Sequence, residues 1–212
     1  MSIGFILDLD GVICDTAKFH FQAWEKLAAE YGYTLTNHDN EALKGVSRPD
    51  SLKFILQKAN KSISDEQFEL DLARKNEWYL ELISNMDPTY LLTGVADFFD
   101  RAEARNIPIA LGSASRNANL VLEKLGLKHR FMSIVDANLV TKGKPDPETF
   151  TTAAAMLGIP PNQCFVFEDS AAGIQGAIDG HMTPIGIGNP SDLIYAKYCF
   201  PNLGAFDFQL ID

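Results

Sequence analysis

The sequence predicts an α/β protein in which a parallel sheet forms the core and a helical segment is inserted after the first strand. Short apolar runs recur along the chain, and segments with helical periodicity separate most of them. This alternation is interrupted once, because residues 16–87 contain no convincing strand and are dominated by helical patterns. The expected fold class is therefore α/β with a helical insert.

The expected strands are short runs rich in β-branched and aromatic residues, at 3–7, 107–111, 133–135, 164–167 and 184–187. Helical patterns lie between most of them, for example at 96–105, 119–125 and 148–157. Strands that alternate with helices in this way are typical of a parallel sheet.

The insert contains three apolar stripes at helical spacing. They are Phe19, Trp24, Leu27 and Ala28, then Leu52, Ile55 and Leu56, and finally Phe68, Leu72, Tyr79 and Ile83. Pro88 disfavours a helical conformation at Asp87, so the last helix is expected to end near this point. We predict a core of residues 1–14 and 92–212 and a helical domain of residues 15–91.

The composition argues against several classes of protein. The chain has 212 residues and a formal net charge of −10, which disfavours nucleic acid or an anionic membrane as a general partner. The three cysteines are too widely spaced for a disulfide framework or a zinc motif. No apolar run has the length of a membrane span or the form of a signal peptide, so we expect no membrane association and a cytoplasmic protein with reduced cysteines.

Two carboxylates end the first predicted strand. Asp8 and Asp10 follow an apolar run and precede Gly11. Side chains two residues apart on an extended segment point to the same side, and the carboxyl ends of parallel strands form the usual ligand-binding edge. Two such anions repel each other unless a cation or a proton neutralises them. The pattern therefore indicates either a metal site or an acid–base pair.

Groups at three other positions are expected at the same edge. Ser113 and Ser115 follow the second core strand, where hydroxyls and N–H groups at a helix start can bind phosphate, although such a turn is more often only a helix cap. Lys144 precedes Pro145, and the prolines of this loop fix the backbone and could present the lysine rigidly at the same edge. The alternative interpretation is a solvated lysine in an ordinary loop.

A second acidic pair ends the fourth predicted strand. Glu168 and Asp169 repeat the opening pattern, and helix capping by Asp169 explains only part of it. Together with Asp8 and Asp10, they supply the hard oxygen ligands that suit Mg²⁺.

The order of these motifs resembles the haloacid dehalogenase superfamily of phosphotransferases over nearly the whole chain. The matching features are Asp-x-Asp-Gly-Val, a serine at a strand end, Lys-Pro and Glu-Asp, with a helical insert after the first motif. The resemblance implies a Rossmann-like parallel-sheet core with a small α-helical cap domain. It also implies that Asp8 is the nucleophile that becomes an aspartyl phosphate and that Asp10 is the general acid–base. Ser113 would orient a phosphoryl oxygen, and Lys144 would offset its negative charge.

The resemblance also implies a magnesium-dependent enzyme. Mg²⁺ would be bound by Asp8, by the backbone carbonyl of Asp10 and by Asp169. Glu168 would lie in or next to the coordination shell.

The insert and the core loops resemble a mutase branch of this superfamily, which converts β-glucose 1-phosphate into glucose 6-phosphate through glucose 1,6-bisphosphate. The similar stretches are 15–24, 43–52, 73–76, 113–117 and 168–175. Arg48 would bind the distal phosphate, assisted by Arg116 and Asn117. The other substrate contacts that the resemblance implies are His20, Trp24, Gly45, Val46, Ser51, Lys75 and Ser115. Among them, His20 would help to position Asp10 when the cap closes.

Several of these residues also have a simpler interpretation. A helical histidine such as His20 is more often a packing or surface residue, and Trp24 is expected to pack between cap helices. Arg48 and Lys75 could be ordinary solvated charges. Arg116 stands where the mutase branch has lysine, which keeps the charge but changes its geometry.

Two alternatives to a mutase stay open. A Mg²⁺-dependent sugar-phosphate phosphatase would use the same chemistry but admit water. A non-catalytic phosphate sensor is disfavoured, because binding alone needs neither a nucleophile such as Asp8 nor an acid such as Asp10. For either enzyme, we expect a monomer whose partner is a small-molecule sugar phosphate.

Overall fold

A computed structural model describes residues 3–211 and contains a single six-stranded parallel sheet in the order β3-β2-β1-β4-β5-β6. The strands are β1 (Gly4–Leu7), β2 (Ile109–Gly112), β3 (Ser133–Val135), β4 (Cys164–Glu168), β5 (Thr183–Ile187) and β6 (Tyr198–Phe200). Strand β1 is central, and its Leu7 is in register with Leu111 of β2 and Phe167 of β4. The α/β prediction is confirmed, although β6 was not predicted.

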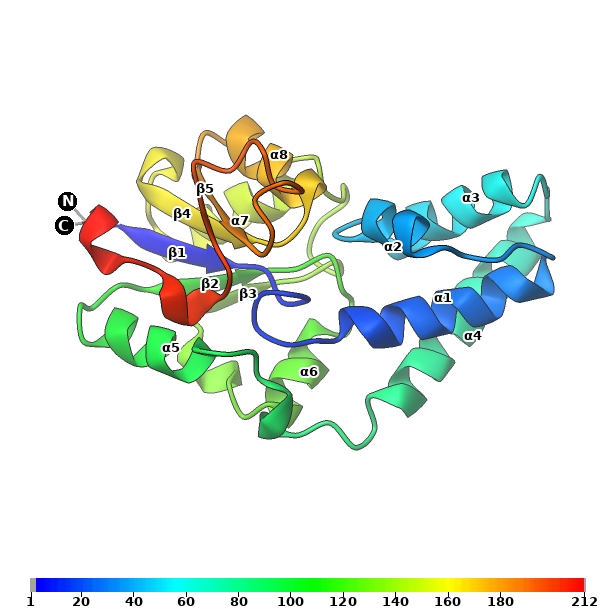
Figure 1. The fold of residues 1–212 in the computed structure, drawn as a ribbon, viewed down its shortest axis with the longest axis horizontal. Coiled ribbons are helices and arrows are strands. Elements are labelled where there is room, and N and C mark those ends of the chain that lie inside the picture. Colours follow the sequence, from blue (N-terminus) through cyan, green and yellow to red (C-terminus); the bar gives the residue numbers. More distant parts are fainter. Residues whose placement is uncertain (1–2, 212) are drawn as a thin grey trace.

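Helices cover both faces of the sheet (Figure 1). Helices α5 (Val95–Glu103) and α6 (Ala118–Lys124) pack on one face, and α7 (Glu148–Leu157) and α8 (Ala171–Asp179) pack on the other. Phe5 and Leu7 belong to the first layer and Ile6 to the second, because successive side chains of a strand point to opposite faces. Short 3₁₀ turns lie at Pro88–Tyr90, Lys128–Arg130, Pro161–Gln163, Leu203–Ala205 and Phe208–Ile211.

The inserted segment forms four helices to one side of the sheet (Figure 1). They are α1 (Ala17–Glu30), α2 (Asn37–Leu43), α3 (Arg48–Lys58) and α4 (Asp65–Leu82). Trp24, Leu52, Ile55 and Leu72 form a hydrophobic cluster of their own between these helices, as the apolar stripes predicted. Tyr79 and Ile83 differ from the prediction because they join the cluster of the sheet domain instead, and Phe19 packs against that cluster.

The helical segment is joined to the sheet domain by two neighbouring backbone segments. Cys14 forms an isolated bridge to Leu91, and the Leu92 N–H donates to the Ile13 carbonyl at 3.0 Å. The chain therefore leaves the sheet domain and returns to it at almost the same place.

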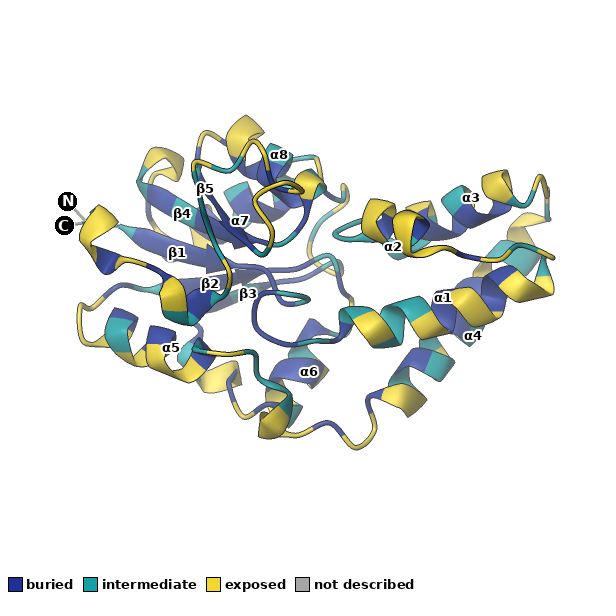
Figure 2. Cartoon of the chain, in the orientation of Figure 1, coloured by how far each residue is buried: buried dark blue, intermediate teal, exposed yellow. Residues whose placement is uncertain are grey.

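Burial follows the same division, since the strands are largely buried and the outward faces of the helices are exposed (Figure 2). Among residues 3–211, no helix is both long enough and apolar enough to cross a membrane.

Gly94 provides a test of the packing at the start of α5. Its φ is +80°, and a Cβ added there would lie 2.2 Å from the Cα of Gly204. We expect Gly94→Ala to lower the free energy of unfolding by roughly 3 kcal/mol, through a left-handed backbone and an overpacked contact. Gly126 is the matched control, because its φ is +69° but an added Cβ would meet nothing within 4 Å. Gly126→Ala should lower the free energy of unfolding by about 1 kcal/mol. Urea denaturation measures both variants, and equal losses of stability would contradict the packing argument.

Candidate active site

Lys144 joins two carboxylates at the carboxyl end of the central strands. Its Nζ donates to Asp8 Oδ1 at 2.6 Å and to Glu168 Oε1 at 2.5 Å, and its side chain is fully buried. Burial alone would lower the pKa of Lys144, but the two carboxylates outweigh this effect and raise it above its ordinary value. The ammonium therefore stays charged and holds Asp8 and Glu168 together.

Glu168 is held on its other oxygen by the start of α8. Its Oε2 accepts from the Ser170 N–H at 3.0 Å and from the Ser170 hydroxyl at 2.8 Å. Ser170 also caps the helix, because its Oγ accepts from the Gly173 N–H at 3.0 Å. A Cβ on Gly173 would lie 1.9 Å from Glu168 Cδ, so only glycine lets the helix approach this closely.

Three carboxylates meet where a cation can bind. One oxygen each from Asp8, Glu168 and Asp169 lie within 4.8 Å of one another. Burial raises the pKa of Asp8 to about 7, against the opposing effect of Lys144. Burial also raises the pKa of Asp169 well above its usual range, and the neighbouring Glu168 adds to the shift. A hard divalent cation suits this oxygen donor set and would relieve the repulsion.

Asp10 is placed separately from this cluster, on the side that faces the helical insert. The Thr16 hydroxyl donates to Asp10 Oδ1, and His20 Nε2 lies 3.9 Å from the same oxygen. Burial raises the pKa of Asp10 above its ordinary value. A carboxyl with a raised pKa is suited to give and take a proton.

His20 is oriented by residues of α4. Lys75 Nζ lies 2.7 Å from His20 Nδ1, and the imidazole stacks on the Tyr79 ring at 4.0 Å between centroids. Burial lowers the pKa of His20 well below its usual value, and Lys75 and Arg48 lower it further. Nδ1 lies within hydrogen-bond distance of Lys75, while Nε2 faces Asp10.

Lys75 is itself buried at 1% exposure. Its ammonium lies 4.5 Å from the Trp24 ring centroid, so Trp24 combines cap packing with a cation–π contact. Burial lowers the pKa of Lys75 well below its usual value, and Arg48 adds to this effect.

The loop after β2 is ordered by a series of hydrogen bonds. Ser113 Oγ accepts from the Ser115 N–H at 3.1 Å, and Ser115 Oγ accepts from the Asn117 N–H at 3.2 Å. Asn117 Nδ2 then donates to Asn76 Oδ1 of α4 at 2.8 Å, which links the sheet domain to the insert.

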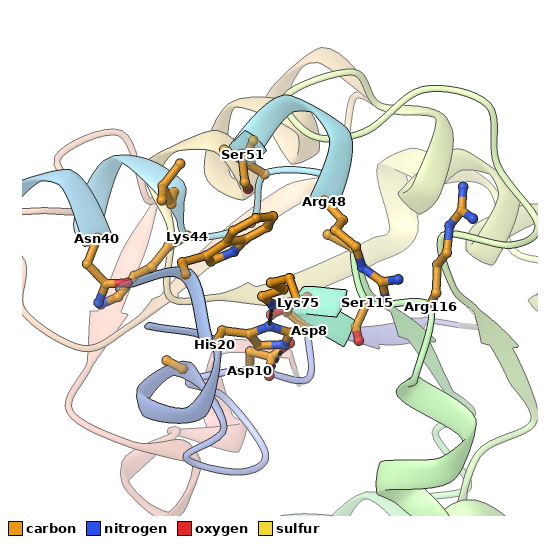
Figure 3. A pocket seen from close by; sticks show the side chains of 16 residues that line it. Asp8, Asp10, His20, Asn40, Lys44, Arg48, Ser51, Lys75, Ser115 and Arg116 are labelled. Carbon is orange, nitrogen blue, oxygen red and sulfur yellow. Dashed lines mark hydrogen bonds and ion pairs between the residues drawn. The ribbon is translucent and has the colours of Figure 1, made fainter. Parts of the chain in front are cut away.

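A pocket lies between the insert and the sheet domain and contains about 690 Å³ of empty space, open to solvent at its mouth (Figure 3). The sequence-predicted residues that line it are Asp8, Asp10, His20, Trp24, Gly45, Val46, Arg48, Ser51, Lys75, Ser115 and Arg116. Three other predicted site residues lie next to Asp8, namely Lys144, Glu168 and Asp169. Ser113 is buried and does not line the pocket. Asn117 forms a hydrogen bond with Asn76 instead of lining the pocket.

Two arginines give this pocket a positive end. In residues 3–211, neither the Arg48 nor the Arg116 side chain forms an ion pair with an acid. Burial lowers the pKa of Arg48, and the neighbouring Arg116 lowers it further, as expected for two cations that share one region. Figure 3 shows Arg48 reaching toward Ser115, with Arg116 beside it.

The insert rests directly on the catalytic edge of the sheet. A Cβ on Gly45 would lie 2.6 Å from Ser170 Oγ, and a Cβ on Gly143 would lie 3.1 Å from the Ser47 Cβ. Gly45 also has a φ of +71°, which favours glycine for a second reason.

Some pocket residues were missed by the sequence reasoning. Lys44 lines the pocket, with its Nζ 3.9 Å from Asp169 Oδ2, and Asn40 lines it from α2. Lys44 lies beside Gly45 in a stretch that the family resemblance marks, which was the available signal. Thr16 and Tyr79 support Asp10 and His20 through contacts that no local pattern indicates.

Comparisons with known proteins agree with this geometry. A family model described as haloacid dehalogenase-like hydrolase matches residues 4–181. The β-phosphoglucomutase of Bacillus subtilis is 41% identical over 194 residues, which cover 90% of this chain and 85% of that protein. A fructose-1-phosphate phosphatase of Escherichia coli is 34% identical over 179 residues, covering 82% of this chain and 90% of the phosphatase. A crystal structure of β-phosphoglucomutase from Clostridium difficile matches with a TM-score of 0.95 at 38% identity, and covers 100% of this chain and 96% of the other.

The contact between Lys75 and His20 provides a direct test of the site electrostatics. Replacing Lys75 with methionine removes a group that lowers the pKa of His20, so this pKa should rise while burial still holds it below its usual value. A ¹H–¹⁵N NMR titration of the imidazole measures this shift. Lys61→Met is the control at an exposed position, and an unchanged His20 titration in Lys75→Met would contradict the assigned contact.

Proposed function

Because the chain belongs to the haloacid dehalogenase-like hydrolase family, we propose that it is a β-phosphoglucomutase, which interconverts β-glucose 1-phosphate and glucose 6-phosphate. The observation that carries this proposal is a pocket with a buried Asp8–Lys144 pair at one end and two arginines without acidic partners at the other. Such a pocket suits a sugar that bears a phosphate at each end.

Asp8 is the nucleophile in this proposal. Lys144 holds one oxygen of the Asp8 carboxylate, which leaves the other oxygen to attack the phosphorus atom. The bond from phosphorus to the sugar oxygen breaks as the bond to Asp8 forms, giving an aspartyl phosphate. Ser113 and the N–H groups of its loop orient the phosphoryl oxygens.

Asp10 supplies and accepts the proton. As an acid it protonates the sugar oxygen that leaves, and as a base it takes the proton from the hydroxyl that attacks the aspartyl phosphate. Thr16 and His20 hold its carboxyl group toward the pocket. Glucose 1,6-bisphosphate is the intermediate, and it must present each of its two phosphates to Asp8 in turn.

The oxygen cluster fits Mg²⁺ by its donor chemistry. Asp8, Asp169 and the backbone carbonyl of Asp10 would hold the ion, with Glu168 next to the shell because both of its oxygens already accept hydrogen bonds. When bound, Mg²⁺ supplies positive charge that offsets the charge on the transferring phosphoryl group.

The helical segment, which we place at residues 15–91, acts as a cap in this proposal. Arg48 and Arg116 bind the distal phosphate, and Asn117 supports this end of the pocket through its hydrogen bond to Asn76. The remaining cap residues surround the sugar, namely His20, Trp24, Gly45, Val46, Ser51 and Lys75, with Ser115 from the core. The cap rests on the core at Gly45 and excludes water, so that a sugar hydroxyl accepts the phosphoryl group. We also propose that the enzyme works as a cytoplasmic monomer, because one chain supplies every group and all three cysteines are free.

A sugar-phosphate phosphatase on the same scaffold is the second candidate. The similarity to the fructose-1-phosphate phosphatase of E. coli supports it. Such an enzyme would form the same aspartyl phosphate on Asp8 but would transfer the phosphoryl group to water.

A product assay separates the two functions. Purified protein with Mg²⁺ and a trace of glucose 1,6-bisphosphate should convert β-glucose 1-phosphate, but not the α anomer, into glucose 6-phosphate with little release of inorganic phosphate. Asp10→Asn should lower this rate by about 10²-fold to 10⁴-fold, since it removes the general acid–base. Release of phosphate without glucose 6-phosphate would establish the phosphatase, and near-normal turnover by Asp10→Asn would remove Asp10 from its assigned role.

Mg²⁺ binding should depend on pH because protons compete for the same carboxylates. Folding raises the pKa of Asp8 from its ordinary value to about 7, so the metal-free protein loses stability as the pH rises toward 7. Mg²⁺ binds the deprotonated form and should raise the melting temperature more above pH 7 than below it. Because protons compete at both Asp8 and Asp169, the apparent Kd should rise at least about tenfold for each pH unit below 7.

Thermal unfolding in a Mg²⁺ titration at several pH values measures this coupling. KCl at the same ionic strength controls for screening, and Asp169→Asn should remove most of the Mg²⁺ effect. An apparent Kd that is independent of pH would show that Mg²⁺ does not bind at Asp8.

A further inference from the structure

A second cavity adjoins the active-site pocket on the outside of the seam between cap and core. We call it the outer groove. It contains about 1080 Å³ of empty space and is lined by residues 47–50 and Lys53 of the cap, and by Arg116, residues 140–143 and neighbouring residues of the core. Arg48, Ala114 and Arg116 line both cavities. The outer groove therefore adjoins the pocket above Asp8, and these three residues form the boundary between the two cavities.

The outer groove is basic although the whole chain has a net charge of −10. Its lining includes the four cations Arg48, Lys53, Arg116 and Lys142 and the acid Asp50, while Asp146 and Glu148 contact the wall at Lys142 from outside the lining. The side chains of both arginines lack an acidic partner within residues 3–211. The cations are thus concentrated on the path from solvent to the distal end of the pocket.

The two lysines have only weak alternative partners. Lys53 pairs with Asp50 at 2.9 Å, with the two side chains 66% and 55% exposed, and Lys142 pairs with Asp146 at 3.2 Å. Exposed ion pairs of this kind contribute little free energy, so both ammonium groups can exchange a carboxylate for a phosphate.

The cap supplies one wall of the outer groove and the core supplies the other. The cap wall begins at Ser47, the core wall includes Gly143, and the two walls are in contact where a Cβ on Gly143 would lie 3.1 Å from the Ser47 Cβ. The cations of the cap and of the core therefore face a common space when the cap rests on the core.

We propose that the outer groove is a capture subsite for the trailing phosphate of an incoming sugar phosphate, and that it favours sugar bisphosphates; this inference rests on the proposed function. A ligand whose leading phosphate approaches the acidic end at Asp8 leaves its second phosphate among Arg116, Lys53 and Lys142. This phosphate then moves inward to Arg48 as the sugar enters the pocket. The outer groove thus orients the bisphosphate and raises its rate of association.

The preference for a bisphosphate follows from charge. Each phosphate group carries about −1.5 to −2 charges at neutral pH, so a bisphosphate has about twice the charge of a monophosphate. Only the bisphosphate has a charged group left for the outer groove when its leading phosphate points at Asp8. Removing the groove lysines should therefore affect the bisphosphate more strongly.

The test compares Lys53→Ala/Lys142→Ala with the control Lys61→Ala/Lys128→Ala, which removes the same charge from exposed sites elsewhere on the chain. Stopped-flow and steady-state assays give kcat/KM for β-glucose 1,6-bisphosphate as phosphoryl donor and for β-glucose 1-phosphate. At low salt, the groove variant should lower kcat/KM about tenfold for the bisphosphate and about threefold for the monophosphate, and both losses should shrink as salt is added.

Other outcomes would overturn the proposal. They are an unchanged kcat/KM, equal losses for both ligands, a loss that does not depend on salt, or the same losses in the control. A change confined to inhibition by inorganic phosphate would assign the outer groove to the free anion instead. If the wild type forms no glucose 6-phosphate, the mutase function fails. The outer groove is then tested by comparing the groove variant with the control variant for phosphate release from the bisphosphate and from glucose 6-phosphate.

Discussion

The buried contact of Lys144 with Asp8 and Glu168 is the constraint on which the rest of the site depends. Three carboxylates converge at the carboxyl ends of β1 and β4, and their mutual repulsion would drive them apart without a cation. Lys144 balances part of this charge, and the start of α8 holds the remaining oxygen of Glu168. Asp8 therefore keeps one orientation, which is what a nucleophile requires.

The cap brings a different set of charges over this nucleophile. Burial lowers the pKa of His20 beside Asp10, and the nearby Lys75 and Arg48 lower it further. The two ends of the pocket thus differ in sign, with carboxylates at one end and guanidinium groups at the other. A sugar with a phosphate at each end suits this arrangement because the two arginines attract one phosphate, while Lys144 and a bound cation would offset the carboxylates that face the other.

The sequence predicted the parallel sheet, the helical insert and the residues at the strand ends, because each depends on local periodicity or on the general geometry of parallel sheets. It predicted less about contacts between distant segments. The His20–Lys75 contact joins residues 55 positions apart, and the Asn76–Asn117 bond joins the two domains. Asn117 was expected in the pocket, yet its amide bonds Asn76. Strand β6 was missed because three partly buried residues carry almost no pattern.

The paired backbone segments at Cys14 and Leu91 have a consequence for how such a protein diversifies. Since the inserted helices leave and rejoin the sheet domain at adjacent points, their length and sequence can change without stretching the strand that carries Asp8. The nucleophile Asp8 and the acidic cluster lie in the sheet domain, while most residues around the pocket mouth belong to the inserted helices. The inserted helices can therefore be replaced during evolution while the strand that carries Asp8 keeps its place in the sheet.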